Sequence, residues 1–147
     1  MIKLFTIGFT GKSAEDFFNL LRSNKVKKIM DIRLNNVSQL SGYAKGADLK
    51  FFAKEICKIE YEHNVDFAPT KEILSRYRDK KMTWHEYEAA YLKLLDMRKI
   101  AQKTDINNLH MNCLLCSENT PENCHRRLLA EYLKHVNNKI KIVHLIK

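Results

Sequence analysis

Glycine and proline are scarce in this sequence, with four glycines and two prolines among 147 residues. So few leave little room for long flexible linkers. No apolar run approaches the roughly 20 residues of a membrane-spanning helix. Met1–Phe5 reads as a strand and not as the charged segment followed by an apolar segment that is typical of a secretory signal. Repeats and low-complexity segments are also missing. We therefore expect a single domain over residues 1–147, located in the cytoplasm and not in a membrane.

Cysteine is present, but only at four positions. In a cytoplasmic protein these thiols should be reduced, so a disulfide framework is not expected. Apolar residues make up 45% and charged residues 29% of the chain, which fits a folded domain and not a disordered one. A chain of this length buries about two thirds of its unfolded surface, which is enough for a core.

Acidic residues are outnumbered, with 17 Asp and Glu against 26 Lys and Arg, for a net charge of +9. Such an excess favours an anionic partner, for example a nucleotide or nucleic acid. Lysines scattered over exposed helix faces would give the same count, and the sequence does not show whether they share one face. It also gives no indication of the oligomeric state.

Apolar periodicity alternates between short strands and helices along the chain. The expected strands are 3–8, 28–33, 60–63, 111–116 and 141–146, and the expected helices are 13–24, 48–58, one from Thr70, one from 83 to about 102 and one from Thr120. This order predicts an α/β fold with a mainly parallel central sheet and helices on both faces. In open sheets of this kind ligands bind at the carboxyl ends of the strands.

One short segment, Leu114–Arg127, concentrates the reactive side chains. A strand-to-helix turn exposes backbone N–H groups that favour bound anions. Neighbouring imidazole and guanidinium groups lower a thiol pKa, so Cys124 or Cys116 is a candidate nucleophile, with His125 and Glu118 as proton carriers. The alternative is that both thiols are packed and inert.

Candidate ligand-binding residues follow several strands. Asp31 and Arg33 point to the same face of their strand, so Arg33 could bind an anion while Asp31 orients it. The alternative is an ion pair that only holds the following loop. The other candidates are Thr10, Tyr43, Lys45, Ser117 and Arg126.

The cysteines could also suggest a metal site, because Cys113 and Cys116 have a C-x2-C spacing and His125 lies nearby in sequence. Positions three apart on a strand point to opposite faces, however, and there is no second such pair. We therefore expect no metal and no cofactor. The aromatic residues of the helices, including Tyr77, Trp84 and Tyr87, are expected in the core and not in a base-stacking platform.

Motifs along nearly the whole chain resemble the domain-of-unknown-function 488 proteins. They are Thr6–Gly8, Asp31–Arg33, Gly42–Lys45, Ala68–Thr70, Trp84–Tyr87, Leu115–Glu118 and Cys124–Arg127. The family usually has a proline between the arginine of its Asp-x-Arg segment and the next serine, whereas this chain has Asn35, Asn36 and Val37 there. The resemblance implies a small cytoplasmic α/β domain of prokaryotic type, and it implies no particular activity.

These observations support two main functional hypotheses. The first is an enzyme whose Cys/His/Arg site acts on a phosphate-bearing ligand, either a nucleotide or a nucleic acid. The second is a non-catalytic nucleic-acid-binding module with structural cysteines, whose affinity falls steeply with salt. A third possibility is that the turn is purely architectural and that the partners are proteins. The enzyme hypothesis requires the turn with Cys116 and Cys124 to share a pocket with Arg33.

Overall fold

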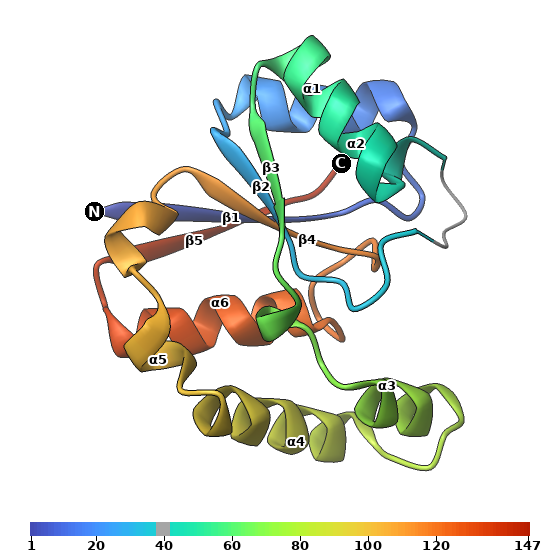
Figure 1. Ribbon diagram of the computed structural model, residues 1–147, viewed down its shortest axis with the longest axis vertical. Helices are drawn as coiled ribbons and strands as arrows, with labels where there is room; N and C mark the ends of the chain where they lie inside the picture. Colours follow the sequence, from blue (N-terminus) through green and yellow to red (C-terminus); the bar gives the residue numbers. More distant parts are fainter. Residues whose placement is uncertain (38–41) are drawn as a thin grey trace.

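The computed structural model describes residues 1–37 and 42–147. In this part of the chain five strands form one sheet in the order β3-β2-β4-β1-β5, and every neighbouring pair is parallel. The strands are β1 (Ile2–Gly8), β2 (Lys28–Asp31), β3 (Glu60–His63), β4 (Asn112–Cys116) and β5 (Ile140–Leu145). The predicted α/β class with a parallel central sheet is confirmed (Figure 1).

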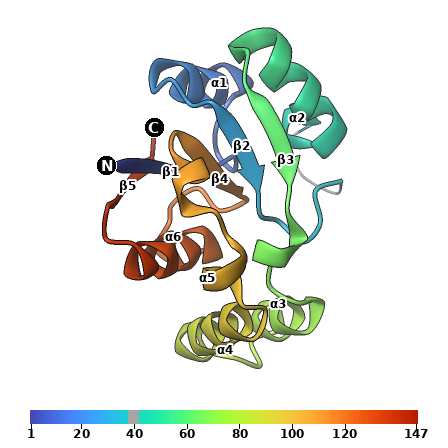
Figure 2. The same cartoon turned by 60° about the vertical axis from the view of Figure 1, so that its left-hand side comes forward.

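Helices cover both faces of the sheet (Figures 1 and 2). One face carries α1 (Ala14–Ser23) and α2 (Gly46–Phe52), and the other carries α6 (His125–Val136). On the α6 side the chain also forms α3 (Lys71–Arg78), α4 (Trp84–Met97) and α5 (Ile100–Lys103), and α4 packs against α6. Short 3-10 turns lie at Gly42–Ala44, Val65–Phe67 and Ile106–Leu109, and a π-helical turn at Ala53–Cys57 continues α2.

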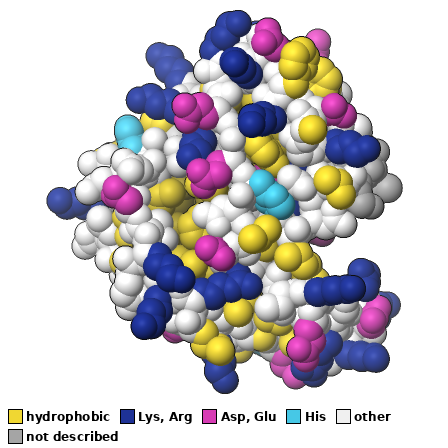
Figure 3. Space-filling view, viewed as in Figure 1, with side chains coloured by type: hydrophobic (Ala, Val, Ile, Leu, Met, Phe, Trp, Pro, Cys, Tyr) yellow, Lys and Arg dark blue, Asp and Glu magenta, His cyan; other side chains and the backbone are white. Residues whose placement is uncertain are grey.

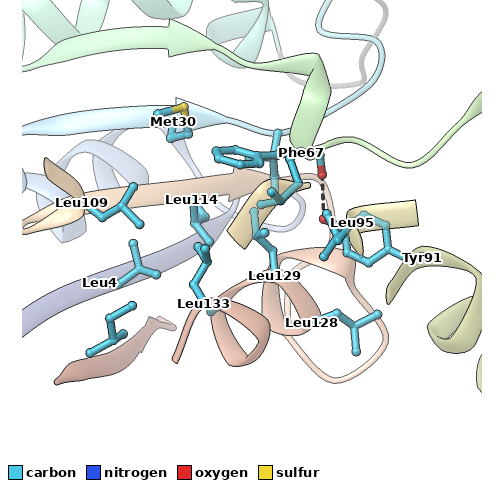
Figure 4. Packing of buried hydrophobic residues seen from close by; sticks show 14 of the residues in the cluster. Leu4, Met30, Phe67, Tyr91, Leu95, Leu109, Leu114, Leu128, Leu129 and Leu133 are labelled. Carbon is cyan, nitrogen blue, oxygen red and sulfur yellow. Dashed lines mark hydrogen bonds between the residues drawn. The ribbon is translucent and has the colours of Figure 1, made fainter. Parts of the chain in front are cut away.

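Each face of the sheet has its own apolar core. Under α6, Leu4 and Leu114 from the strands pack with Leu129 and Leu133 of the helix (Figure 4). Burying each such leucine contributes about 2 kcal/mol. The Tyr91 hydroxyl of α4 donates a 2.6 Å hydrogen bond to the Phe67 carbonyl, so the helical layer is also held by a polar contact. Among the described residues, none of the helices is both long and apolar enough to span a bilayer.

The helix predicted to start at Thr120 starts later. Pro121 lies in the turn, and α6 begins at His125 with Cys124 as its N-cap residue. The turn after β4 is therefore longer than expected, which gives it room to fold over the sheet edge.

Two other helices also differ from the bounds that the sequence predicts. The helix expected from 83 to about 102 is interrupted after Arg98, because Lys99 adopts a left-handed conformation with φ 57°. The helix expected at 48–58 starts at Gly46, and its π-helical turn changes the face that meets the core. Ile56, whose spacing from Leu49 would place it on the same face of a regular α-helix, is therefore 42% exposed.

The topology opens a crevice at one edge of the sheet. β2 and β4 are neighbours, but the chain leaves β2 towards α2 on one face and leaves β4 towards α6 on the other. Connections that diverge in this way leave a gap between the carboxyl ends of adjacent strands, which is the usual ligand position in open α/β sheets.

Candidate functional site

A pocket of about 210 Å³ lies at this divergence of β2 and β4. It is formed by the loop after β2, the turn after β4, and α3 with α4. The lining residues are Arg33, Leu34, Asn35, Leu74, Tyr77, Trp84, Tyr87, Cys116, Ser117, Glu118, Asn123, Cys124 and His125. The space-filling view shows the surface notched on this side, between the region of the loop after β2 and α3 (Figure 3). Pockets for drug-sized ligands start at roughly 300 Å³, so this one takes a single ring-sized group.

The pocket brings Cys116, Cys124 and His125 together with Arg33, as the enzyme hypothesis requires. The sulfur of Cys116 lies 3.5 Å from Nδ1 of His125. Nε2 of the same ring lies 2.8 Å from the carbonyl oxygen of Ile32, so Nε2 carries the hydrogen that this bond requires. In the neutral ring Nδ1 is then the nitrogen without a hydrogen, and the Cys116 sulfur, which is also 3.8 Å from Nε2, lies beside the ring.

The two thiols differ in their acidity. A hydrogen bond from the Cys124 thiol lowers the pKa of Cys116, whereas burial raises it. The backbone N–H groups of Ser117 and Glu118 and the charge of Arg126 lower it further, so the net shift is downward. Burial raises the pKa of Cys124, and its hydrogen bond to Cys116 raises it further. Of the two candidates for the nucleophile, Cys116 is therefore the more acidic thiol, with Cys124 as its hydrogen-bond donor.

Asp31 and Arg33 form a bidentate ion pair at the end of β2. Nε of Arg33 lies 2.8 Å from one Asp31 carboxylate oxygen, and Nη2 lies 2.7 Å from the other. Nη2 also donates to the carbonyl oxygen of Ala44, across the loop. The hydroxyl of Tyr61 donates to Asp31, and burial followed by this bond raises the Tyr61 pKa. Arg33 lines the pocket while Asp31 holds it from behind.

Arg126 lies beneath the turn after β4 and is fully buried. Its Nη1 donates to the carbonyl oxygen of Glu118 at 2.6 Å, and its Nη2 donates to that of Asn119 at 3.3 Å. Nη1 also lies 3.5 Å from the Cys124 sulfur. Its guanidinium is thus engaged in holding the turn, which is the architectural role that the sequence had left open.

The remaining predicted residues fall into two groups. Ser117 and Glu118 line the pocket. Thr10, Tyr43 and Lys45 are not part of its lining. The Tyr43 hydroxyl lies 2.9 Å from the carbonyl oxygen of Lys12 and joins the loop to the end of β1, whereas Thr10 and Lys45 are exposed.

A metal could use three donors of the pocket. The sulfurs of Cys116 and Cys124 and a ring nitrogen of His125 all lie within 4.8 Å of one another, and all three residues are buried. Two sulfurs and an imidazole form a set that binds soft cations such as zinc. Cys113 belongs to the core on the opposite face, as its position in the strand predicts. Our expectation of no metal is not tested by these contacts.

The sequence predicts the rings of Tyr77, Trp84 and Tyr87 in the core, and Tyr87 does lie there, with the other two packed against it. That the three rings also form a wall of the pocket was not predicted. Tyr87 is buried, but Tyr77 and Trp84 are only partly so. The rings of Trp84 and Tyr87 are stacked, with centroids 5.0 Å apart and an interplanar angle of 17°. The one available signal was the Trp84–Tyr87 motif in the family resemblance, since helical periodicity does not separate a core ring from a ring at a pocket.

The fold and the pocket define a parallel α/β protein with a thiol–imidazole site at the carboxyl edge of its sheet. The family model described as Domain of unknown function DUF488 matches residues 13–133, so the chain belongs to that family. The comparisons with curated proteins and with solved structures gave no match. Because the family description names no activity, the function has to be argued from the pocket.

Proposed function

We propose that the protein is an enzyme in which the Cys116 thiolate attacks the phosphorus of a small phosphate-bearing substrate, a nucleotide or part of a nucleic acid. An S–P bond forms as the P–O bond to the leaving group breaks, and water then hydrolyses the S–P bond. The observation that carries this proposal is the position of the Cys116 sulfur, 3.5 Å from Nδ1 of His125 in a pocket that Arg33 also lines. Catalytic thiols depend on such an adjacent base and on nearby positive charge.

The roles follow from the contacts. His125 takes the thiol proton on Nδ1 while Nε2 stays bonded to Ile32, which fixes the ring. The Cys124 thiol donates to the thiolate and keeps its pKa low. Glu118 is at the mouth of the pocket, where it can transfer a proton to or from the leaving group or water. The Ser117 hydroxyl provides a contact for the anionic part of the substrate, and Arg33, whose guanidinium is held by Asp31 and Ala44, contributes positive charge to the pocket wall.

Thiol alkylation as a function of pH tests the proposal. With iodoacetamide and peptide mapping, we expect Cys116 to react at pH 7 at least about tenfold faster than Cys57 and Cys113, and with an apparent pKa below the ordinary value of about 8.5. Burial raises the pKa of both comparison thiols. The Cys124→Ala variant should shift the apparent pKa of Cys116 upward, because the main donor to its sulfur is removed.

Labelling of Cys116 only after unfolding would contradict the proposal and favour a non-catalytic module with structural cysteines. Zinc would also slow the labelling, so metal content is measured on the same sample. If a chelator that removes zinc restores fast labelling, the sulfurs are metal ligands and not a nucleophile with its donor.

A further inference from the structure

The hairpin of α3 and α4 joins the pocket to a second, basic hollow. Tyr77 and Trp84 line the thiol pocket, and they also line an adjoining hollow of about 570 Å³. The other residues of that hollow are Arg78, Lys80, Lys81, Met82, Thr83 and Glu86. Figure 3 shows Lys and Arg side chains gathered over α3 and the turn that follows it. The two rings therefore lie between the thiols of the pocket and a group of cations.

The acidic residues of the hairpin are largely engaged within it. The Glu86 carboxylate accepts a 3.0 Å hydrogen bond from the backbone N–H of Thr83, as part of the capping box of α4. Asp79 lies 3.7 Å from Arg78. Within the described residues, neither Lys80 nor Lys81 has a carboxylate oxygen within 4.0 Å. Both lysines are exposed and can contact an external anion.

Backbone hydrogen bonds fix the turn that carries these lysines. The N–H of Lys80 donates to the carbonyl oxygen of Tyr77 at 3.1 Å, and the N–H of Lys81 donates to that of Arg76 at 2.8 Å. Lys80 itself is left-handed, with φ 58°. The cations thus lie at fixed backbone positions next to the rings, which lowers the entropy cost of binding.

We infer that the substrate is a single-stranded nucleic acid, with one base against the Tyr77–Trp84 wall and its neighbouring phosphates on Arg78, Lys80 and Lys81; this inference rests on the function proposed above. The thiol pocket accepts one ring-sized group, so most of a larger substrate must lie outside it. The basic hollow continues from the same rings, and cations interleaved with aromatic rings suit a strand whose phosphates alternate with bases. A base inside a duplex is stacked on both faces by its neighbours, so a duplex does not fit.

Trp84 is the only tryptophan in the chain, which makes the stacking measurable. The test titrates the protein with a mixed-sequence DNA strand of about 12 nucleotides, its duplex, an abasic strand of equal length and a poly-glutamate peptide. We expect the single strand to bind and to quench Trp84 fluorescence. The abasic strand should bind through its phosphates without comparable quenching. The duplex and the peptide should bind at least about tenfold more weakly.

Two matched charge variants locate the phosphate contacts. Lys80→Ala/Lys81→Ala removes two cations from the inferred surface, whereas Lys50→Ala/Lys54→Ala removes two from a different hollow beside β3. We expect only the first pair to weaken binding, and to reduce the slope of log affinity against log salt by about 1.4. These exposed positions leave the core intact, so the comparison does not depend on a packing change.

The inference is overturned if both pairs weaken binding equally, if the duplex or the peptide binds as well as the single strand, or if no binding occurs at low salt. Its failure is distinguishable from failure of the proposed enzyme. A Cys116→Ser variant should still bind the strand and quench Trp84. Fast alkylation of Cys116 in a protein that does not bind the strand would leave the thiol chemistry intact and reject this substrate class.

Discussion

Gly8, at the carboxyl end of β1, lies directly under the turn after β4. A Cβ atom at this position would overlap the carbonyl oxygen of Glu118 and would lie 2.8 Å from Nη1 of Arg126. Those two atoms form the bond that holds the turn in place. The absence of a single side-chain atom therefore allows the turn to approach the sheet and to aim Cys116 into the pocket.

Gly8→Ala is expected to destabilise the protein by about 3 kcal/mol, because the turn has to move away from the sheet. Urea denaturation followed by circular dichroism measures the loss. Gly42→Ala is the control, since no atom lies within 4 Å of its added Cβ, and it should leave stability nearly unchanged. Equal stability of the two variants would mean that the turn yields without cost.

At the scale of elements, the shortage of glycine has a structural consequence. Among the residues that the structure describes, five other than glycine have a positive φ: Lys25, Lys58, Lys80, Lys99 and Met111. Glycine is the residue that usually occupies such positions at helix ends. Because lysine stands at the end of several helices, the usual stop signal is missing, and this is why the break between α4 and α5 did not follow from the pattern.

Lys99→Gly should therefore raise the free energy of unfolding by about 1 kcal/mol, since it relieves a left-handed conformation between α4 and α5. The same substitution at Lys93, which is exposed inside α4, should lower it by about 1 kcal/mol. Thermal melts of both variants against the unmodified chain provide the measurement. A decrease at position 99 comparable to that at 93 would show that the lysine side chain has a stabilising contact there.

On the scale of the whole molecule, the charge of +9 makes additional protons unfavourable. The most direct case is His144 of β5. Burial lowers the pKa of His144, and the charges of Arg126 and Arg127 lower it further. The nearby carboxylates of Glu131 and Glu122 raise this pKa, but they do not reverse the shift. Nδ1 of His144 lies 2.6 Å from the hydroxyl of Thr6, so the ring connects β5 to β1 and, through Thr6, to Arg126.

The sign of the pH effect follows from that shift. Above the unfolded histidine pKa of about 6.5 the ring is neutral in both states. Below it the unfolded chain binds a proton more readily than the folded chain, so stability falls as the pH decreases towards the folded pKa. We expect His144→Asn, which keeps an acceptor for Thr6, to lose less melting temperature on acidification from pH 7 than the unmodified chain.

His85→Asn serves as the comparison, because the His85 side chain is 96% exposed. It should retain the full acid-dependent loss of melting temperature. If His144→Asn shows the same loss, other groups are responsible for the decline in acid.

The sequence by itself determined the α/β class, the alternation of strands and helices that gives a parallel sheet, and the strand ends that meet at one edge of that sheet. These follow from local periodicity and from caps such as Ser13, whose side chain accepts a hydrogen bond from the Asp16 N–H. It also predicted that Cys116, Cys124, His125 and Arg33 lie together, because parallel strands end at the same edge.

Only the tertiary structure decided what each of these groups does. Arg126 is engaged by the carbonyl oxygens of Glu118 and Asn119, and the low pKa belongs to Cys116 and not to Cys124. The aromatic wall also depends on where α3 and α4 pack, far along the chain from the thiols. Hydrogen bonding, burial and pKa depend on neighbours distant in sequence, and local residue spacing carries no information about those neighbours.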